Sequence, residues 1–201
     1  MKSFHIFTKL KAVIRTLFFA CMISNFFNEA GFAIDEFSEL KTVAEKSDFT
    51  ATSKHSEVIE FQNQLAKMSS IVSNREIGRT VNGRSMQATI IAEPAYNFGS
   101  STESRLVVLL LGNIHSGECA GKEGLLMLLR DVASTKDHPW LKDVVVVCLP
   151  NYNADGNDRI GRNEIHRPGQ IGPSAGMGLR ENAQQLDLNR DFIKIESPEA
   201  R

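Results

Sequence analysis

His115 and Glu118 are the residues whose types and spacing most directly indicate metal chemistry. They lie three residues apart, so one tight turn through Ser116 and Gly117 can aim an imidazole and a carboxylate at the same point. Zinc binds neutral His and Asp or Glu side chains, and a catalytic zinc site leaves one position open for water. By spacing alone, such a pair is more often an ordinary surface or capping arrangement, so its position in the fold and the motifs that follow decide the interpretation.

The elements on either side place this pair at the end of a strand. Residues 106–111 are a short apolar run that ends at Gly112 and Asn113, which is typical of a buried strand. Residues 120–133 then have the spacing of a helix that packs back on that strand. Its apolar face comprises Leu125, Leu126, Leu128 and Leu129. In open α/β sheets, ligands bind at the carboxyl ends of the strands, which is where the pair is expected.

Other segments complete a sheet. Residues 144–149 are a second apolar, β-branched run, which predicts a buried strand parallel to the first. Residues 76–92 form two extended runs around an Asn-Gly dipeptide, the strongest short hairpin signal, and this hairpin is expected to pair with the sheet edge. Residues 56–70 have helical spacing. We therefore predict one α/β domain with a mixed, largely parallel central sheet and helices on both faces.

The loop from residue 150 to residue 185 is long for a compact domain, and such loops are usually functional or disordered. It carries four arginines without apolar periodicity, which suits either a wall around a pocket for an anionic group or a solvated polar loop. These are Arg159, Arg162, Arg167 and Arg180.

The segment that follows, residues 186–192, ends in a second group of polar side chains. Adjacent Asn189 and Arg190 could clamp a carboxylate, because a guanidinium offers a planar bidentate fork and the amide adds a donor. After it, Ser197 and Pro198 have the pattern of a helix start.

The first 33 residues differ from the rest of the chain. Four basic residues precede a mostly apolar segment that is short for a membrane span, and Gly31 and Ala33 place small residues where a signal peptidase acts. This pattern predicts a secretory signal cleaved after Ala33 and a secreted or periplasmic protein. An uncleaved N-terminal anchor is the alternative, and lipid attachment at Cys21 fits less well.

Composition restricts the class of partner. The 201 residues contain 42% hydrophobic side chains, which is ample for one core. Without residues 1–33 the chain would keep 19 basic and 23 acidic side chains, and such a mildly acidic domain offers no footprint for nucleic acid. Cys119 and Cys148, the cysteines outside the signal, are too few for a disulfide scaffold and are expected as buried thiols, although pairing is not excluded.

Three motifs together resemble the zinc carboxypeptidase family, of the carboxypeptidase A and B type. They are residues 112–118 (Gly-Asn-Ile-His-Ser-Gly-Glu), 153–156 (Asn-Ala-Asp-Gly) and 187–190 (Asp-Leu-Asn-Arg), each after the expected strand. The resemblance covers residues 76–201 and implies Zn²⁺ as the cofactor. It assigns His115 and Glu118 as metal ligands, and it assigns Asn189 and Arg190 to the C-terminal carboxylate of a substrate. Arg167, with Arg162 as the second choice, would polarise the scissile carbonyl and stabilise the oxyanion.

The likeness is incomplete in two respects. Ala154 stands where the family usually has Pro. The family's third zinc ligand, a His, and its general-base Glu both follow the Asn-Arg motif, and no residue after Arg190 matches either. The chain is therefore expected to be the N-terminal portion of a metallopeptidase and to be catalytically silent alone.

The resulting domain prediction has three parts: a signal peptide (residues 1–33), a leader with a helix (34–75) and an incomplete zinc carboxypeptidase-like domain (76–201). The expected activity of the parent protein is hydrolysis of C-terminal peptide bonds. Two alternatives remain open, an amidohydrolase or deacylase of small N-acyl amino acids and a non-catalytic module that binds peptide carboxylates. The expected partner is a peptide or a small acylated amino acid, and the mature chain is expected to lack a membrane span. The sequence does not specify side-chain preference or oligomeric state.

Overall fold

The computed structural model describes residues 36–97, 100, 103–166 and 168–201. Residues from Phe37 to Arg201 form one compact unit. The predicted signal peptide lies outside the described residues. Among the described residues, no helix has the length and apolar character that crossing a bilayer requires.

A four-stranded mixed sheet forms the framework of this unit, in the order β1-β2-β4-β3. Its strands are β1 (Val72–Arg79), β2 (Ser85–Ile91), β3 (Leu106–Leu111) and β4 (Val144–Leu149). β1 and β2 form the predicted hairpin, whose turn includes Gly83 with a φ of 77°. β2 pairs antiparallel with β4, and β3 pairs parallel with β4. The predicted mixed sheet is confirmed, but a largely parallel sheet was expected and two of the three pairings among the described strands are antiparallel. β1 begins four residues before the predicted start at Glu76.

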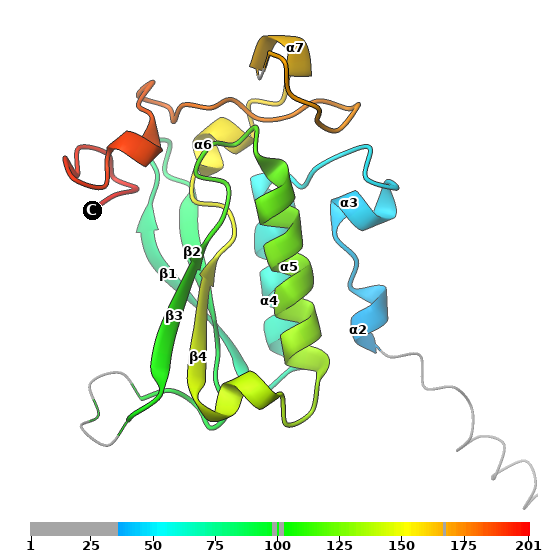
Figure 1. Ribbon diagram of the computed structural model, residues 1–201, viewed down its shortest axis with the longest axis vertical. Helices are drawn as coiled ribbons and strands as arrows, with labels where there is room; N and C mark the ends of the chain where they lie inside the picture. The colour runs from blue at the N-terminus through cyan, green and yellow to red at the C-terminus, as the bar shows by residue number, and fades with distance from the viewer. Residues whose placement is uncertain (1–35, 98–99, 101–102, 167) are drawn as a thin grey trace, which may run out of the picture. The chain divides into compact units, whose positions relative to one another are not determined.

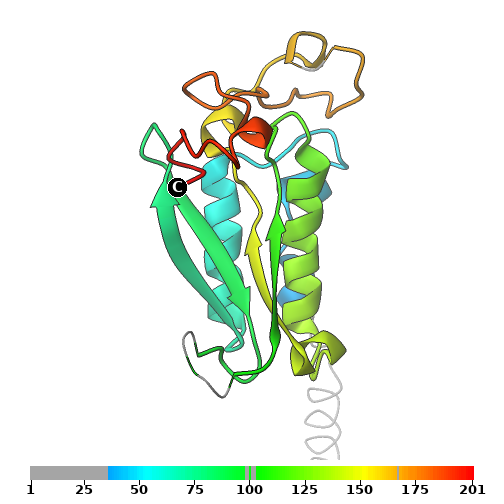
Figure 2. The same cartoon turned by 60° about the vertical axis from the view of Figure 1, so that its left-hand side comes forward.

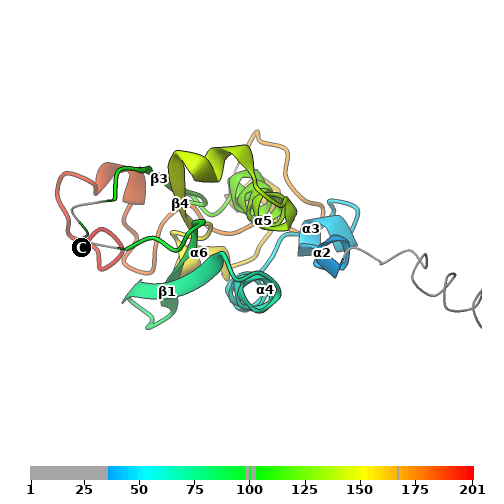
Figure 3. The same ribbon diagram turned by 90° about the horizontal axis from the view of Figure 1, so that it is seen from below.

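Two long helices, α4 (His55–Met68) and α5 (Cys119–Ser134), run side by side along the sheet (Figure 1). Seen from below, both lie on the same face of the strands (Figure 3). Helices on both faces were expected. The one crossover between parallel strands in the described residues joins β3 to β4 through α5, and it places α5 on the same face as α4.

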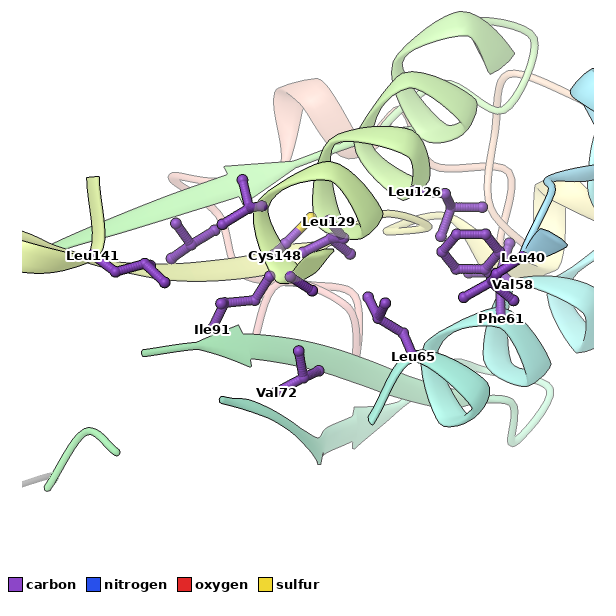
Figure 4. Packing of buried hydrophobic residues seen from close by; sticks show 13 residues of the cluster. Leu40, Val58, Phe61, Leu65, Val72, Ile91, Leu126, Leu129, Leu141 and Cys148 are labelled. Atoms are coloured by element: carbon purple, nitrogen blue, oxygen red, sulfur yellow. The ribbon is translucent and has the colours of Figure 1, made fainter. Parts of the chain in front are cut away.

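The main core fills the space between this helix pair and the sheet. In α4 the buried residues Val58, Phe61 and Leu65 recur every three to four positions, and Leu126 and Leu129 of α5 face them (Figure 4). Strand residues complete the same cluster, among them Val72, Ile91, Val146 and Cys148. Burial of these apolar side chains stabilises the packing of the two helices on the sheet.

Strand β3 was expected to be buried and is not. Leu106 is 70% exposed and Leu109 is 58% exposed. An apolar run predicts a strand with neighbours on both sides, but β3 is an edge strand of the described sheet. In contrast, Val145 and Cys148 of β4, which lies between two strands, are fully buried.

Short elements fill the remaining segments. They are the helices α2 (Glu36–Glu39), α3 (Val43–Lys46), α6 (Ala154–Asn157) and α7 (Asn163–His166), and the 3-10 helices Pro139–Lys142 and Leu188–Arg190. The predicted helix start at Ser197 gives only a turn, in which Ala200 N donates to Ser197 Oγ at 3.2 Å. The buried carboxylate of Asp191 accepts from the amides of Glu196 and Ser197, which fixes this turn.

The loops after β3 and β4 and the C-terminal segment gather at one end of the sheet, the upper end in Figures 1 and 2. All three predicted motifs therefore lie at the carboxyl ends of the parallel strands.

Candidate metal centre and substrate site

His115 and Glu118 lie in a tight turn between β3 and α5. The turn is closed by a hydrogen bond from Glu118 N to His115 O at 2.8 Å. Nδ1 of His115 is 3.2 Å from Oε1 of Glu118. The side chain of His115 is buried, whereas that of Glu118 is 50% exposed. The two candidate ligand atoms therefore meet at a place that solvent can reach.

The other ring nitrogen of His115 is held by Asp187. Nε2 lies 2.7 Å from Oδ1 of Asp187, and Nη1 of Arg180 lies 3.1 Å from Nδ1. Arginine can only donate hydrogen bonds, so Nδ1 is the acceptor and Nε2 carries the proton that it donates to Asp187. With this assignment, the ring nitrogen beside Glu118 carries the lone pair.

Asp187 is kept ionised by its surroundings. Burial by itself would raise the pKa of Asp187, but hydrogen bonds from His115 and Arg180 outweigh it and lower the pKa to about 2. Nη2 of Arg180 lies 2.7 Å from Oδ2 of Asp187. A carboxylate bonded to the far nitrogen of a metal-binding histidine fixes the ring orientation and makes the ring a better ligand.

The second motif binds the neighbouring loops together. Asn153 is fully buried, its Oδ1 accepts from Gly156 N, and its Nδ2 donates to Arg180 O at 3.0 Å. Its own carbonyl accepts from Ser116 Oγ at 2.8 Å. At Gly156 a Cβ atom would lie 2.6 Å from Glu181 O, so only glycine allows this approach. The motif therefore positions Arg180 and the turn that carries His115.

Asn189 and Arg190 lie in the 3-10 helix Leu188–Arg190, and both are exposed. Asn189 N donates to Oδ1 of Asp187 at 3.0 Å, the same oxygen that His115 contacts. Nη1 of Arg190 lies 3.2 Å from the carbonyl of Asn189. Asp187 thus connects the predicted carboxylate clamp to the predicted metal ligand, while Arg167 lies outside the described residues.

A cavity of about 430 Å³ opens beside Glu118. Its walls come from the end of β3, the His115–Glu118 turn, the start of α5 and the loop residues Gln170 and Ile171. The cavity therefore gives a small ligand access to Glu118.

The two ligand atoms fit zinc as neighbours. Two ligands of a tetrahedral zinc ion with bonds of about 2.1 Å lie roughly 3.4 Å apart, and Nδ1 of His115 and Oε1 of Glu118 are 3.2 Å apart. Among residues 36–97, 100, 103–166 and 168–201, no group of three His, Cys, Asp or Glu side chains could hold a metal ion. His115 and Glu118 are therefore two candidate ligands, one fewer than the three protein ligands of a catalytic zinc site.

Sequence reasoning assigned no role to Asp187, and it counted Arg180 only among the arginines of the loop. Asp187 could have been suspected because it lies two residues before Asn189, in position to cap that turn. Arg180 had no comparable signal, because an arginine in an aperiodic loop does not indicate which way its side chain points.

Comparison with solved structures defines the class of fold. A metallo-carboxypeptidase from Burkholderia cenocepacia superimposes with a TM-score of 0.50 at 23% identity, covering 73% of this chain and 34% of that one. Bovine thrombin-activatable fibrinolysis inhibitor gives 0.52 at 15% identity, covering 72% and 44%. At these identities the likeness establishes a metallocarboxypeptidase type of fold.

Residues 58–200 match the Zinc carboxypeptidase family, and the chain belongs to that family. Carboxypeptidase Z of Mus musculus is 29% identical over 138 residues, which is 66% of this chain and 20% of that protein. Carboxypeptidase 2 of Trichophyton rubrum is 29% identical over 116 residues, which is 55% and 21% of the two chains. The chain thus spans about a fifth of the length of these relatives.

Proposed function

We propose that this chain is the N-terminal part of a secreted, zinc-dependent metallocarboxypeptidase that hydrolyses C-terminal peptide bonds. The observation that carries the proposal is that His115 Nδ1 and Glu118 Oε1 lie 3.2 Å apart, while Asp187 contacts the other ring nitrogen. Family membership supports zinc as the metal. Cleavage after Ala33 remains part of the proposal, since residues 1–35 lie outside the described residues.

The residues of the candidate site then have separate roles. Bound zinc supplies a Lewis acid for the scissile carbonyl and acidifies water. His115 and Glu118 hold the metal, and Asp187 keeps the imidazole proton on Nε2. Asn189 and Arg190, which are exposed beside Asp187, orient the terminal carboxylate of the substrate.

Arg180 fits the role of the oxyanion-stabilising cation that the resemblance assigned to Arg167. Its guanidinium lies 3.1 Å from Nδ1 of His115, and its backbone carbonyl is fixed by buried Asn153. A preorganised cation at the reacting carbonyl is worth about 10²–10³ in rate. The described residues lack a third metal ligand, so the 201-residue chain alone is expected to be inactive.

The metal site is tested by zinc titration of the 201-residue chain against a chromogenic chelator. One zinc ion should bind, more weakly than at a three-ligand site, and His115→Ala and Glu118→Gln should each weaken this binding by about tenfold or more. Glu164→Gln, an exposed carboxylate with 73% of its side chain accessible, is the matched control and should leave binding unchanged. Equal affinity in the wild type and His115→Ala would overturn the proposed site.

The carboxylate site is tested with N-acetyl dipeptides that end either in a free carboxylate or in an amide. NMR titration should show binding of the carboxylate form only, and Arg190→Ala should abolish it. Lys194→Ala, an exposed cation nearby in sequence, should have no effect. Binding of the amide with equal affinity would exclude a carboxylate clamp.

A further inference from the structure

Lys122 is a buried cation that the proposed chemistry does not use. It lies one helical turn after Glu118 on α5, and its side chain is 0% exposed. Its ammonium group donates hydrogen bonds to the carbonyl of Ser53 and to Oδ1 of Asn157, the latter at 2.6 Å. Burial of a charged group is unfavourable unless it is paired and hydrogen-bonded, so these contacts decide whether the lysine is tolerated.

Glu123 balances this charge. Its Oε1 lies 3.7 Å from Nζ of Lys122, and its carboxylate accepts from Ser53 N, Ser53 Oγ and Thr52 Oγ1. Burial lowers the pKa of Lys122, while the charge of Glu123 acts in the opposite direction. The contacts of Nζ with Ser53, Asn157 and Glu123 are all with oxygen atoms, which suits an ammonium group that donates in a fixed geometry.

The network continues from Lys122 towards the candidate metal centre. Oδ1 of Asn157 also accepts from Nδ2 of Asn113, at 3.0 Å, and the same Nδ2 donates to Oδ1 of Asn151 at 2.7 Å. Asn113 lies two residues before His115 and has a φ of 60°, a left-handed conformation that a non-glycine residue adopts at some cost. Asn157 and Asn113 are both buried.

These hydrogen bonds fix residues on both sides of the turn that carries the two candidate metal ligands. Asn113 precedes the turn, and α5, which bears Lys122, begins at Cys119 directly after Glu118. Asn113, before the turn, and Lys122, after it, therefore donate hydrogen bonds to the same atom, Oδ1 of Asn157.

We propose that Lys122 is a positioning residue that acts through Asn157 and Asn113 to hold His115 and Glu118 at ligating separation. The role rests on the proposed zinc site, although the geometric constraint on the turn can be measured without the metal.

The test is a double-mutant cycle on the 201-residue chain. Lys122→Met keeps the length of the side chain and removes the ammonium group. Asn113→Gly permits the positive φ and removes the amide. Each should weaken zinc binding about tenfold, as loss of a supporting contact typically does. The double variant should bind no more weakly than Lys122→Met alone, because both substitutions break the same chain of contacts. Multiplied losses in the double variant would overturn the proposal.

A second readout separates positioning from general loss of stability. Hydrogen–deuterium exchange of residues 112–118 should accelerate in both variants. Gln62→Leu is the matched control, since Gln62 is fully buried but its Nε2 donates to Gln87 and Thr89 of β2. This control should leave zinc affinity and exchange of the turn unchanged. If Gln62→Leu changes both as much as Lys122→Met does, Lys122 contributes only to general stability and the positioning role is wrong.

The two proposals fail separately. If the wild type binds zinc and both variants bind it equally well, the positioning role is wrong and the proposed zinc site stands. If the wild type binds no zinc, exchange of residues 112–118 still tests Lys122. If Lys122→Met does not fold, Asn113→Gly decides the question, because it leaves α5 intact. A folded Asn113→Gly variant with wild-type exchange in the turn would overturn the positioning role.

Discussion

Nε2 of His115 lies 2.7 Å from Oδ1 of Asp187, which joins the first chemical motif of the sequence to the last across 72 positions. The same oxygen accepts from Asn189 N, and the second oxygen of Asp187 pairs with Arg180. One carboxylate therefore orients the candidate metal ligand, the candidate carboxylate clamp and the nearby cation.

Asp187→Asn is expected to weaken zinc binding by about 10-fold to 100-fold. An amide has one acceptor oxygen, so if it accepts from His115 its NH₂ group faces the guanidinium of Arg180, donor against donor. A competition titration with a chromogenic chelator measures the change. Asp131→Asn on α5, where the side chain is 71% exposed, is the control and should bind zinc as the wild type does. Unchanged affinity in Asp187→Asn would show that the ring needs no support from this carboxylate.

Arg180→Met is expected to strengthen zinc binding by about tenfold. The guanidinium lies 3.1 Å from Nδ1 of His115 and so competes with a metal for the same lone pair. The positive charge of Arg180 beside the ligand nitrogen would also repel a divalent cation. The same titration provides the measurement.

The control for this change is Arg159→Met, an exposed arginine of the same loop, which should leave the affinity unaltered. If Arg180→Met instead weakens binding, the support that Arg180 gives to Asp187 matters more than the repulsion.

The sequence predicted the elements well where a single periodic pattern determines them. β4 was predicted over residues 144–149 and found there, and the hairpin at Gly83 followed from its turn chemistry. Burial was less predictable, because it depends on neighbours. The six apolar residues of β3 form the predicted strand, yet their exposure reflects its place at the edge of the described sheet.

Polar side chains inside the fold were the least predictable part of the candidate site. His115 and Glu118 could be chosen because their spacing restricts them to one turn. Lys122 and Glu123 are buried on the inner side of α5 although helical patterning assigns that side to leucines. Apart from the ion pair between them, their hydrogen-bond partners lie 35 or more positions away. Periodicity within a helix contains no information about such contacts.

Leu109→Lys is expected to reduce self-association of the 201-residue chain. β3 presents exposed apolar side chains at the edge of the described sheet, and Leu109 is 58% exposed. Open apolar edges promote pairing between molecules, and an edge lysine opposes it. Light scattering against concentration measures the effect.

Ile165→Lys, in the short helix α7 and 68% exposed, is the control for the loss of an exposed apolar side chain. Equal reduction by both substitutions would indicate general solubilisation and not pairing through β3.

Glu45→Gln is expected to lower the free energy of unfolding by about 1 kcal/mol at pH 7. Arg130 of α5 donates two hydrogen bonds of 2.8 Å to this carboxylate, and Thr42 N also donates to it. Burial would raise the pKa of Glu45, but these contacts outweigh it and hold the pKa below its ordinary value of 4.5. A lowered pKa in the folded state means that the stabilisation is complete above 4.5 and is lost as the pH falls through the folded value. Urea unfolding at pH 7 and pH 3 should therefore show a difference in the free energy of unfolding between wild type and Glu45→Gln that shrinks at the lower pH.

The control is Glu164→Gln, which removes an ion pair whose side chains are 78% and 73% exposed. It should change the free energy of unfolding little at either pH. A constant difference between wild type and Glu45→Gln at both pH values would mean that the carboxylate charge does not carry the stabilisation.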